Sequence, residues 1–301
     1  MKLFLITGLL ALALATPTHA QTPAEPTPAA RPTPLPKVEP PTEEITITSS
    51  RLPRIVRTFV DVATMPSPIG QVSRWKVWIC PKTTGMSPGF TNFVTKRIRE
   101  IATGIGAPVN PNENCAPNLQ IIFTERPQEM LDVIRVKLPA LLGYHYAPQA
   151  KELATVSHPI QGWYATGSRD RMGQLISDNP YGFATTTVEG SRIKTGLRSE
   201  FVAVTVVVDL VTIENQEIGA IADHIAMLAF SQARAFERCR EVPSITNMLL
   251  PCDPELKAVA LTRYDRAYLR ALYAITDRDT KSPLLKGDIS FLMRRFLNEE
   301  K

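Results

Sequence analysis

The sequence lacks the short motifs that identify many enzyme classes. It has no G-x-x-x-x-G-K-S/T phosphate-binding loop and no G-x-G-x-x-G turn, which argues against nucleotide chemistry. It also has no G-x-S-x-G nucleophile elbow, which weakens a serine-hydrolase interpretation. Histidine is scarce, with only four in 301 residues. These patterns predict no cofactor.

Charge of one sign is never concentrated along the chain. The 34 lysines and arginines and 29 acidic residues give a net charge of +5, and no block of consecutive like charges is present. We interpret the basic residues as a solvated surface, so no nucleic-acid partner is predicted. If the chain is exported, the acidic partners that a mildly basic protein could meet are envelope components, such as phospholipid or lipopolysaccharide headgroups. The ligand itself stays unknown.

The first twenty residues predict an export signal. Lys2 precedes an apolar run over 3–15, and the small residues Thr18 and Ala20 then mark a cleavage site, so that residues 1–20 form the predicted signal peptide. A helix needs about 20 apolar residues to cross a bilayer, and this run is shorter. We therefore expect a periplasmic or secreted protein with no transmembrane segment in the mature chain.

Beyond the signal, the sequence divides by composition. Residues 21–44 contain eight prolines, which fix φ and remove amide donors, so a disordered Pro-rich linker is predicted. Residues 45–215 are expected to form an α/β region that contains the sheet. Residues 216–301 are expected to be helical and to pack on the same domain. Between 143 and 200 the chain is rich in Gly, Ser, Thr and Pro. After the strand predicted at 160–166, a long irregular region follows, which should border a ligand site if one exists.

Apolar residues recur at intervals typical of both strands and helices. Alternating or continuous β-branched runs predict strands at 44–52, 72–80, 118–124, 160–166 and 200–210. Helical spacing predicts helices from 88 to near 104, from 127, from 217, at 262–277 and at 288–298. The predicted fold class is therefore α/β (α+β), with a mixed sheet and packed helices followed by a disulfide-tied helical C-terminal part.

Four cysteines form an even set, which in an exported protein predicts disulfides. Three pairings are open, but proximity in the chain favours Cys80 with Cys115 and Cys239 with Cys252. On the loop-entropy model each disulfide stabilises the fold by about 3 to 4 kcal/mol. A zinc site is the competing interpretation, but no two cysteines have the close spacing that zinc sites use.

Several stretches between Val72 and Ala274 carry a family resemblance. EIGAIADHIAMLAFSQ with SITNMLL, LTRYDRAYLRALYA, and WICPKTTG with CAPNLQIIFT resemble secreted alphaproteobacterial proteins of unknown function. The resemblance implies a degenerate zincin-like, metallopeptidase-type scaffold. A zincin needs two histidines one helical turn apart with a glutamate between them. Here Leu228 occupies the second ligand position and Ile225 the glutamate position, so the resemblance implies a scaffold without the HExxH apparatus.

Histidines from separate segments could in principle meet at a metal. His145, His158 and His224 remain after removal of the signal, and Asp209 or Asp223 could join them. Isolated histidines are more often surface residues or satisfied core residues. We therefore predict no metal site.

Asp223 beside His224 is the one weak candidate for catalysis. The two could act as a base for a nucleophile such as Ser168 or Ser231, which would make the chain a peptidase-like hydrolase. The preferred interpretation assigns no catalytic residue. It describes a non-catalytic exported binding or envelope-associated protein, with the hydrolase as the alternative.

Overall fold

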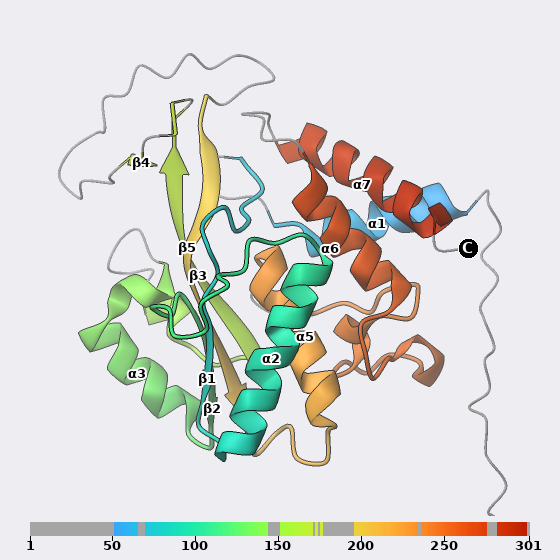
Figure 1. Ribbon diagram of the computed structural model, residues 1–301. Helices are drawn as coiled ribbons and strands as arrows, with labels where there is room; N and C mark the ends of the chain where they lie inside the picture. The colour runs from blue at the N-terminus through green and yellow to red at the C-terminus, as the bar shows by residue number, and fades with distance from the viewer. Residues whose placement is uncertain are drawn as a thin grey trace, which may run out of the picture. The chain divides into compact units, whose positions relative to one another are not determined.

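A five-stranded mixed sheet lies at the centre of the fold (Figure 1). Its strand order is β1-β2-β5-β3-β4, where β1, β2 and β5 run parallel and β3 is antiparallel to both β5 and β4. The strands are β1 Pro81–Thr84, β2 Leu119–Thr124, β3 Ile160–Arg169, β4 Leu175–Ile176 and β5 Arg198–Asp209. This computed structural model describes residues 51–65, 70–143, 151–170, 172–173, 175–176, 196–233, 236–275 and 282–299.

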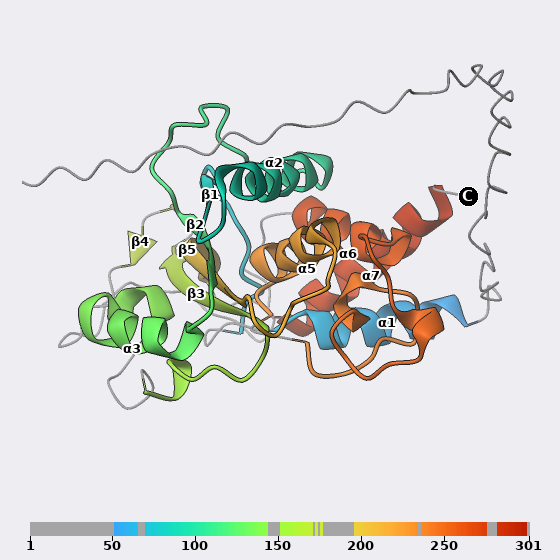
Figure 2. The ribbon, with the colours of Figure 1, turned by 90° about the horizontal axis from the view of Figure 1, so that it is seen from below.

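Helices cover both faces of the sheet (Figure 2). On one face lies α3, while α2 and α5 lie on the other, with α1, α6 and α7 packed beyond them. The helices are α1 Leu52–Ala63, α2 Pro88–Gly104, α3 Pro127–Lys137, α5 Ile218–Ser231, α6 Arg263–Ala274 and α7 Ser282–Glu299. Short 3-10 helices span Pro139–Leu142 (η1), Ile245–Asn247 (η2) and Pro254–Leu256 (η3). This arrangement confirms the predicted α/β class.

The strand β5 explains why helices are needed on both faces. Val204, Val206 and Val208 point into the main core, whereas Val207 packs with α3 and Trp163 in a smaller core. A strand buried on both sides reads as a nearly continuous apolar run, which is how this segment appears in the sequence. Helix α5 is buried almost along its whole length and forms the centre of the main core.

Both predicted disulfides are present. Cys80 bonds Cys115 just before β1 and β2 begin, and Cys239 bonds Cys252 around the turn that contains η2. The described residues belong to one compact unit, Ile47–Lys301. Among the residues described, none of the helices has the length and apolar character needed to cross a membrane.

Two N-terminal expectations need correction. The predicted strand 72–80 is wrong, because this segment forms isolated bridges, among them Arg74 with Glu200 and Ile79 with Val109, and the strand begins at Pro81. Leu52 begins helix α1 rather than ending a strand. The rest of the predicted strand 44–52, the signal peptide 1–20 and the linker 21–44 lie outside the described residues and stay predictions.

Candidate functional site

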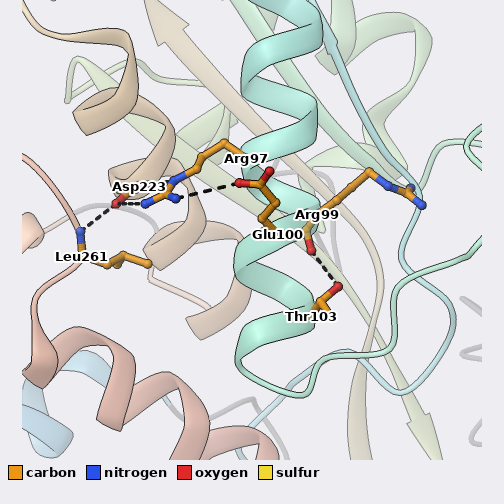
Figure 3. A network of polar contacts seen from close by, with 6 residues as sticks. All are labelled: Arg97, Arg99, Glu100, Thr103, Asp223 and Leu261. Carbon is orange, nitrogen blue, oxygen red and sulfur yellow. Dashed lines mark hydrogen bonds and ion pairs between the residues drawn. The ribbon is translucent and has the colours of Figure 1, made fainter. Parts of the chain in front are cut away.

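Asp223 is a buried carboxylate on α5 that joins three elements (Figure 3). Its side chain is 1% exposed and accepts two hydrogen bonds from Arg97 of α2, from Nε at 2.6 Å and from Nη2 at 2.9 Å. It also accepts the backbone N–H of Leu261, at 2.7 Å, just before α6. This bidentate hydrogen bond raises the pKa of Arg97. The carboxylate is therefore occupied in holding α2, α5 and the start of α6 together.

His224 leaves the helix on a different side from Asp223, because successive helical residues differ by about 100°. Its Nδ1 lies 3.2 Å from the carbonyl oxygen of Ile245, and its ring meets Phe236 edge-on at 5.4 Å. Burial lowers the pKa of His224 to about 4. The imidazole is thus neutral at pH 7, and this geometry gives no support to a catalytic Asp223–His224 pair.

The other candidates from the sequence are dispersed. Ser231 is buried and donates its hydroxyl hydrogen bond to the carbonyl of Met227 one helical turn back, while Ser168 lies on β3. His158 is hydrogen-bonded to Ser157 at 2.8 Å, and His145 lies outside the described residues. Within the described part of the chain, no three His, Cys, Asp or Glu side chains gather as a metal site would require.

A hollow of about 380 Å³ lies where β3 and β5 extend beyond Leu119, the first residue of β2, and we call it the cationic pocket. Four basic side chains and one carboxylate line it: Arg74, Lys76, Arg169, Arg198 and Glu200. Such an excess of basic side chains around one hollow favours an anion.

Strand pairing places two of these arginines opposite each other. The antiparallel register of β3 and β5 makes Arg169 the direct partner of Arg198, and like charges at such positions destabilise a sheet. Glu200 compensates one of them, because its Oε1 accepts a 2.6 Å bond from Arg169 Nε. The Nε of Arg198 is buried and has no hydrogen-bond partner in the described structure. The pocket lining therefore holds one buried N–H donor that is unsatisfied among the described residues.

The opposite wall of the cationic pocket is formed by residues 71–77, most of which belong to the predicted strand 72–80. Arg74 is 4% exposed and donates from Nη2 to the carbonyl oxygen of Ile275, at 2.9 Å. The hydroxyls of Ser73 and Ser199 lie 2.6 Å apart, which ties this wall to β5. Both walls are thus held in place before any ligand arrives, which reduces the ordering cost of binding.

The sequence predicts that the irregular region after residue 166 borders any ligand site. The cationic pocket is lined near the two ends of that region by Arg169, Gly173 and Arg198, and the expectation of a ligand there stays a prediction. The wall over 71–77 was missed because its alternating pattern predicts a regular strand. Comparison with protein-family models, curated proteins and solved structures found no match to this chain. The zincin-like resemblance accordingly stays a prediction.

Proposed function

We propose that this chain is an exported, non-catalytic binding module that holds an anionic ligand in the cationic pocket. The observation that carries the proposal is the cross-strand pair of Arg169 and Arg198. Among the residues that the structure describes, Arg169 has the carboxylate of Glu200 as its partner, whereas the buried Nε of Arg198 has no hydrogen-bond partner. Two disulfides suit an oxidising compartment outside the cytoplasm and support the export expected from residues 1–20.

The basic groups limit the chemistry of the ligand. Guanidinium groups form bidentate hydrogen bonds with carboxylates and phosphates, and three of the four basic lining residues are arginines. A space of about 380 Å³ suits a small multivalent anion or the charged head of a larger molecule. In an envelope, phosphorylated lipid headgroups present this chemistry, and they are the partner class that we propose.

The test is calorimetric titration of residues 21–301 with pyrophosphate and with citrate. A charge-assisted hydrogen bond contributes about 1.5 to 3 kcal/mol, so Arg198→Gln should weaken binding by roughly tenfold or more. Affinity should also fall as salt rises. The matched control is Arg126→Gln, which removes the same charge from an exposed ion pair with Glu129. Equal affinity of Arg198→Gln and wild type, or no binding of either anion, would refute the proposal.

A further inference from the structure

Arg240 is a buried cation without an acceptor. Only 4% of the residue is exposed, and its Nε, Nη1 and Nη2 are all buried without a hydrogen-bond partner among the residues described. The guanidinium carbon lies over two aromatic rings, 5.4 Å from the centroid of Phe59 and 5.5 Å from that of Phe236. Cation–π contacts compensate part of the lost hydration, but they leave the N–H donors without hydrogen-bond acceptors.

The buried carboxylate of Asp265 does not serve as an acceptor for these donors. Asp265 contributes a Coulombic interaction with Arg240, but its oxygens already accept hydrogen bonds from Ser244, Ile245 and Thr262. Desolvation lowers the pKa of Arg240, which records an unfavourable environment for its charge. Unfilled buried donors are among the more costly features of a folded protein, and each one needs an explanation.

Arg240 also lines a hollow of about 430 Å³, which we call the Arg240 pocket. Apolar atoms of Val62, Met65, Ala233 and Phe236 form much of its surface. A second buried polar atom in its lining, Oε1 of Gln232, likewise lacks a partner in the described part of the chain. An apolar hollow with a few unsatisfied polar groups has the character of a ligand site.

The backbone at Arg240 is firmly held. Its N–H donates to Asn247 Oδ1 at 2.7 Å, and the preceding residue, Cys239, is bonded to Cys252. The backbone that carries this side chain is therefore fixed by the fold, which lowers the ordering cost of binding.

We propose that the Arg240 pocket binds an apolar molecule that carries a single carboxylate. The carboxylate would accept hydrogen bonds from the unsatisfied N–H groups of Arg240, and the apolar part would lie against Val62 and Phe236. The lining holds two acidic residues, Asp61 and Glu237, and two basic residues, Arg238 and Arg240. Its formal charges therefore cancel, and such a lining suits a monoanion better than a multiply charged phosphate. This site is separate from the cationic pocket and takes a different class of ligand.

Access requires a side chain in the pocket wall to move, because the guanidinium nitrogens themselves expose almost no surface. Met65 is suited to this movement. Its side chain is unbranched, and the residue is 55% exposed at the pocket.

The test is titration of the protein with decanoate below its micelle concentration, with decanol as the uncharged control. Arg240→Met keeps the volume and removes the charge, so decanoate should bind at least tenfold more weakly while any decanol binding stays the same. Because the variant removes a buried charge that has no hydrogen-bond acceptor among the described residues, its urea midpoint in the absence of ligand should equal or exceed that of wild type. Arg126→Met, at an exposed ion pair, should change neither property.

A second variant keeps the test decisive if Arg240→Met does not fold. Met65→Trp narrows the pocket without touching Arg240, and it should weaken decanoate binding at least fivefold. The proposal is overturned if decanoate does not bind wild type, if decanol binds equally well, or if the folded variants bind decanoate like wild type. Pyrophosphate binding should be unchanged in both variants, which separates this result from the fate of the cationic pocket.

Discussion

Replacing Asp223 by alanine tests whether this carboxylate is structural. In Asp223→Ala the backbone N–H of Leu261 loses its acceptor, and Leu261 is buried. An unsatisfied buried donor costs about 1 to 3 kcal/mol. Arg97 also loses its bidentate partner, but its side chain is 36% exposed and can hydrate, so that loss adds only about 1 kcal/mol. The expected loss of unfolding free energy is therefore about 2 to 4 kcal/mol.

Urea unfolding followed by far-UV circular dichroism measures this loss, provided that the slope m stays unchanged. Glu100→Ala is the matched control. It removes a carboxylate 3.9 Å from the same arginine in an exposed pair, and it should cost less than about 1 kcal/mol. Asp223→Ala should leave pyrophosphate binding intact. A midpoint equal to that of the Glu100→Ala variant would refute the structural role of Asp223.

Three further predictions concern pH, a disulfide and a glycine. Because folding lowers the pKa of His224 from 6.5 to about 4, the unfolded state binds an extra proton between those values, and stability falls as pH drops through that window. In urea unfolding, the free energy of unfolding of wild type should fall by about 3 kcal/mol between pH 7 and 4 because of this histidine, and His224→Leu should not show this fall. The double variant Cys239→Ser/Cys252→Ser removes a disulfide between residues 13 apart in the sequence. Its free energy of unfolding in the same assay should be about 3 kcal/mol lower than that of wild type. Gly85→Ala should lower the thermal midpoint by several degrees, because φ is +94° and a Cβ would lie 1.8 Å from the Phe123 carbonyl oxygen, whereas Gly89→Ala in the open first turn of α2 should not.

The elements that the sequence predicts well are those whose local pattern agrees with their environment. The β-branched run near 200–210 becomes β5, and the apolar stretch after Glu217 becomes α5. Helix α6 starts at a capping box of Thr262 and Asp265, a local signal that needs no tertiary contact. Proximity in the chain likewise selected the correct disulfide pairing.

The wrong predictions depend on contacts between distant segments. Residues 72–80 have the alternation of a strand, but they contact β5 around Ser73 and Arg74 and then diverge from it, so that Ile79 bridges to Val109 instead. Helix α1 was missed because the alternating residues before it favoured a strand that extended to Leu52.

The candidate sites could not be read from the sequence for the same reason. The opposition of Arg169 and Arg198 depends on the register of β3 and β5, which shifts at an irregularity between Ala165 and Thr166. The burial of Arg240 depends on Phe59, which is far away in the chain. Local patterns carry no signal for such pairings.

The most direct test of the account is the NMR signal of the Arg198 Nε–H group, assigned by its loss in Arg198→Gln, during titration of ¹⁵N-labelled protein with pyrophosphate. If the cationic pocket is the binding site, this signal shifts and saturates with the affinity found by calorimetry, while the Nε–H signal of Arg126 stays in place. An Arg198 signal that stays fixed at saturating pyrophosphate would contradict the account.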